Sequence, residues 1–342
     1  MKAVIFKQHG GPEVLEYADV PDPTIKGNEV LVEVKACALN HLDIWARGGL
    51  PGIEIPLPHI LGNDIAGVVS DVGDSVSWVR SGDEVMLQPG VSCGHCAECL
   101  AGRDNLCPEY DILGYGRDGG YAQLVAAPAV NVIPKPKNLS WEEAAALPLV
   151  TVTAWHMLVT RAAVQPGEDV LVHAAGSGVG SIGIQVAKLR GARVIATASS
   201  DDKLAKAKDL GADEVVNYSN EDWPKEVKRL TNRKGVDVVF EHTGTATWPG
   251  SIASLKTNGR LVTCGATSGF AAQTDLRQIF YRHLTILGSF MGSKSELLEA
   301  MKFIESGKIR AVIDQTLPLR EAKRAHELMQ NRLQFGKLVL LP

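Results

Sequence analysis

The hydrophobic pattern divides the chain into two parts with different periods. Over residues 1–130, apolar runs such as VLVEVKA, IAGVVSDVG and DEVML alternate with Gly, Pro and Asp turns and show little helical period. This pattern predicts a compact domain of short strands that resembles a β-barrel. The pattern changes at Ser140, which together with Glu143 forms a capping-box sequence that opens an apolar segment running through Trp155.

Beyond that segment, predicted strands and helices alternate. Strands are expected at 169–175, 193–199, 214–218, 236–244, 259–266 and 284–290, with helices at 178–191 and 201–211. This alternation predicts an α/β domain with a doubly wound, six-stranded parallel sheet of the Rossmann type. Two amphipathic helices are then expected at 293–308 and 319–331, followed by a strand at 335–341 that rejoins the first domain.

Length and charge restrict the possible classes of protein. A chain of 342 residues with ordinary globular composition favours two domains. The formal charge of -4 and the lack of any Lys/Arg-rich block argue against nucleic acid as a partner. No apolar window is long enough to span a membrane, and no secretory signal is recognisable, so we expect a cytoplasmic protein that acts on a small molecule.

Four cysteines form a compact C-x2-C-x2-C-x7-C motif at residues 93–107. Four thiolates fill a tetrahedral zinc shell and leave no position open for a substrate. The motif therefore predicts one structural zinc per chain, held by Cys93, Cys96, Cys99 and Cys107. Disulfides within the motif are the alternative, although the two remaining cysteines, Cys37 and Cys264, do not suggest a secreted disulfide framework.

A glycine-rich turn follows the first predicted strand of the α/β part, in the sequence HAAGSGVGSIG. Glycines at 176, 178 and 180, with Val179 between the last two, let the backbone approach a pyrophosphate at the start of a helix. The turn predicts a dinucleotide site at Gly176, Gly178, Val179 and Gly180. A purely structural turn is the alternative.

The end of the second strand indicates which nicotinamide cofactor is used. An NAD site normally places a carboxylate there, whereas this strand ends in Ala198, Ser199 and Ser200. Hydroxyls and an ammonium suit a 2′-phosphate, so Ser199, Ser200 and Lys203 predict NADPH. The alternative is that the serines cap the following helix and that Lys203 is a solvated surface charge.

Several motifs together resemble the medium-chain dehydrogenase/reductase superfamily of zinc alcohol dehydrogenases and quinone oxidoreductases. They are ALNHLDIWARGG, LPHILGNDIAGVVSDVG, the cysteine motif, HAAGSGVG and the terminal FGKLVL. The resemblance implies a GroES-like substrate domain at 1–130 and 294–342, a Rossmann domain at 131–293, and an active site in the cleft.

The resemblance also locates the positions of the catalytic metal ligands in the alcohol dehydrogenase branch. These positions hold Asn40, Asn63 and about Leu149 here, and none is a good zinc ligand. An improvised site from His41, Asp43, His59 and Asp64 is an alternative. The sequence NHLD instead resembles the metal-free quinone oxidoreductase branch.

By the same resemblance, Asn40 and Asp43 are the candidate catalytic groups, and Trp45 and Leu50 the candidate pocket residues. Asn40 as a helix N-cap with Asp43 at the third helical position is the structural alternative. Further cofactor contacts implied by the resemblance are Thr153, Tyr218, His242, Thr243, Gly265, Ala266, Phe290, Met291 and Lys337.

Without a catalytic metal, an unactivated alcohol lacks the group that would stabilise its alkoxide. A quinone or activated alkene accepts hydride more readily, so the sequence predicts NADPH-dependent reduction of quinones, enones or enoyl thioesters. An alcohol dehydrogenase with a recruited metal and a dinucleotide-binding protein of low activity are the alternatives. The apolar last strand, LTILGSF, predicts edge pairing into a homodimer or homotetramer.

Overall fold

The computed structural model describes residues 1–342 and divides into two compact units. Unit 1 comprises Met1–Leu149, Ser293–Leu298 and Arg310–Pro342, and unit 2 comprises Val150–Gly292 and Glu299–Ile309. Unit 1 extends past the boundary expected near residue 130. The physical reason is that strand β10 (Val132–Pro134) pairs with β6 (Glu84–Leu87), and helix α3 (Trp141–Ala145) contacts β3 and β5.

Unit 1 is built on a seven-stranded sheet whose central strand is long. Strand β3 (Glu29–Ala38) pairs with β5 (Asp64–Val72), β9 (Leu124–Pro128) and β18 (Lys337–Leu341), and β6 and β10 continue the order beyond β5. A three-stranded sheet of β2 (Glu16–Asp19), β1 (Lys2–Phe6) and β4 (His59–Ile60) accompanies it. Short strands separated by turns were expected here, and the structure contains them.

The remaining elements of unit 1 are short. They are β7 (Gly90–Val91), which pairs with β8 (Asp111–Ile112), the helices α1 (His41–Gly48) and α2 (Ala97–Leu100), and 3₁₀ turns at Pro12–Val14, Asp104–Leu106, Ala129–Asn131 and Leu319–Glu321. The apolar faces of β1, β3 and β5 enclose a single core with Phe6, Leu61 and Tyr121 fully buried.

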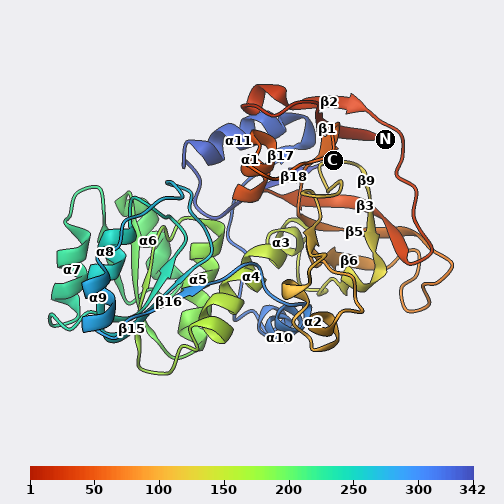
Figure 1. Cartoon of the computed structure of the whole chain (residues 1–342). Coiled ribbons are helices and arrows are strands. Elements are labelled where there is room, and N and C mark those ends of the chain that lie inside the picture. Colours follow the sequence, from red (N-terminus) through yellow and green to blue (C-terminus); the bar gives the residue numbers. More distant parts are fainter. The chain divides into compact units, whose positions relative to one another are not determined.

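The C-terminal segment completes unit 1. Helix α11 (Ala322–Gln330) and strand β18 lie where the sequence predicts them, and Figure 1 shows these blue elements beside the red and orange N-terminal strands. Strand β17 (Ile313–Pro318) was not expected; it pairs in parallel with β18 at the edge of the sheet. The prediction that the last strand rejoins the first domain is confirmed by the pairing of Val339 with Ala38.

Unit 2 contains the predicted parallel sheet in the order β13-β12-β11-β14-β15-β16. The strands are β11 (Asp169–Val172), β12 (Arg193–Ala198), β13 (Glu214–Asn217), β14 (Val236–Glu241), β15 (Leu255–Thr263) and β16 (Thr285–Gly288). The order reverses between β11 and β14, which is the doubly wound arrangement. Strand β14 is buried along its whole length, as expected for a strand covered on both faces.

Helices flank this sheet on both faces in Figure 1. They are α5 (Gly178–Leu189), α6 (Asp201–Asp209), α7 (Trp223–Leu230), α8 (Trp248–Ser254) and α9 (Leu276–Tyr281). Two further helices, α4 (Pro148–Trp155) and α10 (Lys294–Glu305), contain positions where the chain passes from one unit to the other. The apolar segment predicted through Trp155 is split between α3 and α4, because Pro148 lacks the amide hydrogen needed to continue α3.

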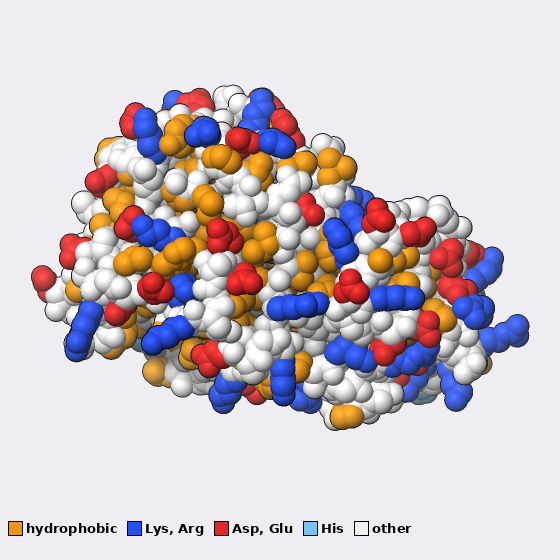
Figure 2. All heavy atoms as spheres, turned by 180° about the vertical axis from the view of Figure 1, so that it is seen from behind, with side chains coloured by type: hydrophobic (Ala, Val, Ile, Leu, Met, Phe, Trp, Pro, Cys, Tyr) orange, Lys and Arg blue, Asp and Glu red, His pale blue; other side chains and the backbone are white.

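The surface of the molecule mixes charges of both signs. On the face drawn in Figure 2, lysine and arginine side chains alternate with aspartate and glutamate side chains, and apolar side chains lie among them. None of the helices combines the length and the apolar character needed to cross a bilayer.

Candidate functional site

Helix α1 begins in unit 1 at a tightly bonded corner. Asn40 has extended backbone angles, and its backbone N–H donates to the Asp43 carboxylate at 2.7 Å. The other oxygen of Asp43 accepts from the Gly62 N–H at 3.0 Å. Asp43 therefore caps the helix, as the structural alternative expected, and also fixes the loop at residue 62.

Burial raises the pKa of Asp43 to about 7, even though the two backbone N–H donors, Asn40 and Gly62, act in the opposite direction. The side chain has no solvent-exposed surface. The pKa therefore lies close to neutral pH, and the corner changes its charge there.

A second carboxylate, Asp64, joins separate parts of the chain. One of its oxygens accepts from the Asn40 amide at 2.8 Å and from the Lys337 ammonium at 2.9 Å. The other accepts from the Leu149 backbone N–H at 2.8 Å. Lys337 also donates to the Asn40 side-chain oxygen at 2.6 Å, so the amide of Asn40 is held in one orientation. We call Asn40, Asp64 and Lys337 the Asn–Asp–Lys cluster.

The three positions that the resemblance assigns to metal ligands lie around this cluster. Asn40 offers an amide already bonded to an ammonium, and Leu149 offers an aliphatic side chain. The Asn63 amide donates to the Leu113 carbonyl at 2.6 Å, and its buried side-chain oxygen has no hydrogen-bond partner. No thiolate or imidazole is present among them, and a cation next to Lys337 would be repelled, so these residues do not fit a zinc ion.

The four side chains of the alternative metal site do not lie close together either. His59 is buried, with Nδ1 at 3.5 Å from Asp118 and its ring 5.6 Å from that of Phe6, while Asp43 and Asp64 are occupied by the bonds above. His41, Asp43, His59 and Asp64 form no group of closely spaced ligand atoms.

Sequence reasoning missed a buried chain of bonds that leads to Asp43. Arg47, which is 1% exposed, donates to His326 Nδ1 at 2.8 Å, and the other ring nitrogen of His326 lies 3.1 Å from the Tyr121 hydroxyl. Burial lowers the pKa of His326 to about 3, so the ring is neutral. Nδ1 accepts from Arg47, and the N–H at Nε2 donates to the Tyr121 hydroxyl. Burial raises the pKa of Tyr121, and the nearby Asp43 carboxylate raises it further. The only signal in the sequence was an arginine directly after the apolar residues 44–46 of a short helix.

Gly62 lets these side chains approach one another. Its φ of +104° is unfavourable for other residues, and an added Cβ would lie 2.6 Å from the Tyr121 ring and 2.7 Å from the Cys37 sulfur. The candidate pocket residues lie nearby in the chain: Trp45 is half-buried on α1 with its ring 5.1 Å from that of His41, and Leu50 forms a bridge with Ile53.

The cysteine motif folds into a compact lobe. The sulfurs of Cys93, Cys96, Cys99 and Cys107 all lie within 4.8 Å of one another, and those of Cys93 and Cys99 are 3.9 Å apart. A tetrahedron with Zn–S bonds of about 2.3 Å has edges of about 3.8 Å. The N–H of His95, together with that of Cys96, lowers the pKa of Cys93 to about 6, which favours the thiolate that a metal requires. The lobe fits zinc.

In unit 2, the glycine-rich turn leads directly into α5. The Ser177 hydroxyl accepts from the Gly180 N–H at 2.8 Å and caps the helix. A Cβ on Gly180 would lie 2.4 Å from the Ala174 carbonyl oxygen, so only glycine allows this close approach of turn and helix. Gly176, Gly178 and Val179 complete a helix N-terminus at the carboxyl edge of the sheet, which is the arrangement that binds a pyrophosphate.

Most of the other predicted cofactor residues also lie at this edge of unit 2. Ser200 caps α6 by accepting from the Lys203 N–H at 3.4 Å, and the Ser219 hydroxyl donates to the Ser199 carbonyl. Tyr218 directly follows β13. The turns after β14, β15 and β16 hold His242, Thr243, Gly265, Ala266, Phe290 and Met291. Thr153 lies in α4 with a buried hydroxyl lacking a partner, whereas Lys337 lies in unit 1.

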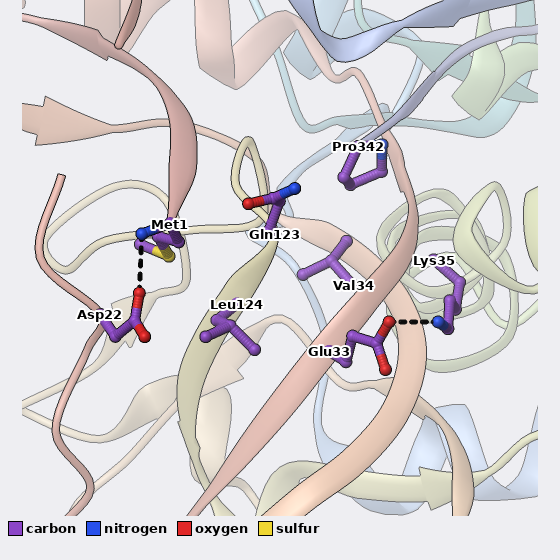
Figure 3. A pocket seen from close by; sticks show the side chains of 8 residues that line it. All are labelled: Met1, Asp22, Glu33, Val34, Lys35, Gln123, Leu124 and Pro342. Atoms are coloured by element: carbon purple, nitrogen blue, oxygen red, sulfur yellow. Dashed lines mark hydrogen bonds and ion pairs between the residues drawn. The ribbon is translucent and has the colours of Figure 1, made fainter. Parts of the chain in front are cut away.

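A surface pocket of about 430 Å³ occurs elsewhere in unit 1. Figure 3 shows its lining, which contains an ion pair between the Met1 amine and Asp22 at 2.7 Å and another between Glu33 and Lys35. None of the residues predicted from the sequence lines it; the lining residues are Met1, Asp22, Glu33, Val34, Lys35, Gln123, Leu124 and Pro342.

Comparison with known proteins identifies the class. Residues 26–137 match the alcohol dehydrogenase GroES-like domain, and residues 178–306 match the zinc-binding dehydrogenase family. The chain therefore belongs to the medium-chain dehydrogenase/reductase superfamily and is an NAD(P)H-dependent oxidoreductase, as its sequence motifs suggested.

Similar proteins carry several activities. A crystal structure of an NAD-dependent alcohol dehydrogenase is 54% identical to this chain with a TM-score of 0.97, and each chain covers 100% of the other. Quinone oxidoreductase 1 of Escherichia coli (strain K12) is 32% identical over 98% of both chains. Crotonyl-CoA reductase of Streptomyces collinus is 33% identical over 94% of this chain and 80% of its own.

The raised pKa of Asp43 predicts a particular pH dependence of stability. Between about pH 4 and pH 7 this carboxyl is ionised in the unfolded state and protonated in the folded state. The free energy of unfolding therefore falls as pH rises, by ~1.4 kcal/mol per pH unit. Asp43→Asn removes this titration. We expect the free energy of unfolding of the wild type, measured with denaturant, to fall relative to that of Asp43→Asn from pH 5 to pH 7.

The exposed Asp74 provides the control, since Asp74→Asn leaves the Asp43 titration in place and should follow the wild-type profile. A constant difference between Asp43→Asn and wild type across this pH range would contradict the prediction.

Proposed function

We propose that the protein is an NADPH-dependent reductase of quinones or activated alkenes that transfers hydride without a catalytic metal. The observation that carries the proposal is the bond from the Lys337 ammonium to the Asn40 side-chain oxygen, at a position where related alcohol dehydrogenases would need a metal ligand. The similarity to a quinone oxidoreductase and a crotonyl-CoA reductase supports it.

The chain's own residues would act as follows. When bound, the nicotinamide supplies a hydride, and the conjugated substrate passes the charge to an oxygen atom. Asn40 is held by Asp64 and Lys337, and its amide nitrogen has a second hydrogen that we assign to this substrate oxygen. Asp43 is a positioning residue, because its oxygens are used by the backbone N–H groups of residues 40 and 62.

An assay of substrates with and without a chelator tests this function. We expect NADPH oxidation by quinones or enones, and about one zinc per chain by elemental analysis, located in the cysteine lobe. Activity should persist under chelation for as long as the fold persists, since the zinc takes no part in hydride transfer.

Two zinc ions per chain, or alcohol oxidation that is lost on chelation and restored by zinc, would instead identify an alcohol dehydrogenase with a recruited metal. Cofactor binding without turnover of any substrate class would identify a dinucleotide-binding protein of low activity.

The choice of NADPH rests on Ser199, Ser200 and Lys203, at a strand end without a carboxylate. Lys203→Ala should weaken NADPH binding by about tenfold and leave NADH binding unchanged, because only NADPH carries the 2′-phosphate. Lys208→Ala, in the last turn of the same helix, is the matched control. Equal wild-type affinities for the two cofactors in a titration would contradict the assignment.

The assembly proposal rests on strand β16, which pairs only with β15 and is largely exposed. Helix α9, which precedes this strand in the chain, also exposes large apolar side chains: Phe280 is 63% and Tyr281 is 81% exposed. An exposed edge of this kind favours pairing with a second copy, so we expect the mass of a dimer or a dimer of dimers by light scattering.

Ile286→Lys, at that edge, should reduce the mass to that of a monomer. Leu333→Lys, which changes an exposed apolar residue of unit 1, should not. A monomeric wild type at micromolar concentration would rule out the assembly.

A further inference from the structure

Four buried polar side chains form a continuous chain of hydrogen bonds at the carboxyl edge of the unit 2 sheet. Thr197 Oγ1 lies 3.2 Å from His173 Nδ1, His173 Nε2 lies 2.9 Å from Ser251 Oγ, and Ser251 Oγ lies 2.6 Å from Glu241 Oε2. None of the four is more than 1% exposed. They come from β12, the end of β11, α8 and β14, so one chain of bonds connects four elements.

The direction of each hydrogen bond follows from the Glu241 carboxylate, which is the last group in the series. A carboxylate only accepts, so the Ser251 hydroxyl donates to Glu241 and must itself accept from an N–H of His173. Burial lowers the pKa of His173 to about 4, so the ring is neutral at pH 7 and its other nitrogen accepts from the Thr197 hydroxyl. Every donor and acceptor between Thr197 and Glu241 is thereby matched.

Glu241 also fixes the turn that follows β14. One of its oxygens accepts from the Thr243 N–H at 2.7 Å and from the Gly244 N–H at 3.2 Å. The Thr247 hydroxyl lies 2.9 and 3.0 Å from the two carboxylate oxygens. Burial raises the pKa of Glu241, but His173 in its protonated form, the Ser251 hydroxyl and the Thr243 N–H together bring it below its ordinary value.

Further bonds connect the neighbouring turns. His242 Nε2 donates to the His173 carbonyl at 2.9 Å, which joins the turn after β14 to the end of β11. The Thr243 carbonyl accepts from both the N–H and the hydroxyl of Ser268, each at 2.7 Å, which joins it to the turn after β15. Glu241 thus lies at the centre of three connected turns.

These turns occupy the place where a doubly wound sheet binds a dinucleotide. Strands β11 and β14 are neighbours, and the strand order reverses between them. The glycine-rich turn begins directly after His173, and Thr243 belongs to the turn on the other side of the reversal. A shift of one turn against the other would change the shape of the pyrophosphate site.

We propose that Glu241 and His173 are positioning residues for cofactor binding. Through Ser251 they hold the turn after β14 in fixed relation to the glycine-rich turn, so that both are ordered before the cofactor arrives and less ordering is required on binding. Their side chains are occupied by one another and act through the backbone of the turns. The inference concerns cofactor affinity and holds whichever substrate the enzyme reduces or oxidises.

Cofactor titrations without substrate test the proposal. Glu241→Gln keeps the shape of the side chain but cannot accept all of these bonds, and we expect it to weaken NADPH or NADH binding about tenfold, or about 1.4 kcal/mol. Ser251→Ala and Thr247→Val each remove one hydroxyl donor and should weaken it about threefold, with kcat at saturating cofactor close to wild type.

Asp237→Asn is the matched control. Asp237 lies at the opposite end of β14, where its carboxylate accepts from the Asp169 N–H at 3.0 Å and pairs with Lys256. This variant should lose stability and keep its cofactor affinity. Unchanged affinity in Glu241→Gln would overturn the proposal, as would an equal loss of affinity in Asp237→Asn.

If Glu241→Gln does not fold, Ser251→Ala and Thr247→Val decide the question. Wild-type cofactor affinity in both folded variants, or a fall in kcat without a change in affinity, would then overturn the proposal. Because substrate is absent from the titrations, a failure of the proposed quinone or alkene reduction is detected separately.

Discussion

The hydrogen bonds that the buried Asp64 carboxylate accepts are the interaction on which unit 1 most depends. The carboxylate has no exposed surface, and it draws together the Asn40 amide, the Leu149 N–H and the Lys337 ammonium from widely separated parts of the chain. A buried carboxylate is costly unless its oxygens are hydrogen-bonded, so this residue requires the helix start at Asn40 and the last strand to take fixed positions. The Asp64 carboxylate thus connects the C-terminal strand to the candidate catalytic amide, in addition to the backbone pairing of β18 with β3.

Unit 2 also contains a buried carboxylate whose oxygens need hydrogen-bond donors, but its partners differ. Glu241 is equally buried, but the groups that satisfy it are hydroxyls and backbone N–H groups, and no lysine or arginine pairs with it. The charge therefore stabilises turns at the carboxyl edge of the sheet rather than joining distant strands. In both units, a buried carboxylate fixes the loops that carry the candidate functional groups, and the reactive chemistry is left to groups those loops present.

The two sets of metal positions illustrate how donor chemistry decides function. The cysteine lobe supplies four sulfurs at a spacing that suits tetrahedral zinc, and their proximity follows from close spacing along the chain. At the other position, the Lys337 ammonium pairs with the Asp64 carboxylate and donates to the Asn40 amide, so the local charge is balanced without a cation from solution. Under the proposed function, this chain would keep a zinc lobe while its hydride-transfer site relies on hydrogen bonds.

The sequence by itself determined the features that depend on local spacing. The alternation of strands and helices gave the sheet of unit 2, the cysteine motif gave the lobe, and the glycine-rich turn gave the start of α5, because each arises from residues close in the chain. Contacts between residues far apart in the chain could not be predicted from the sequence. Nothing local indicates that Lys337 bonds to Asp64, that His326 lies between Arg47 and Tyr121, or that Ser251 joins His173 to Glu241. Those partners are chosen by the tertiary fold, since only folding excludes water from these polar groups and obliges each to find its hydrogen bonds within the protein.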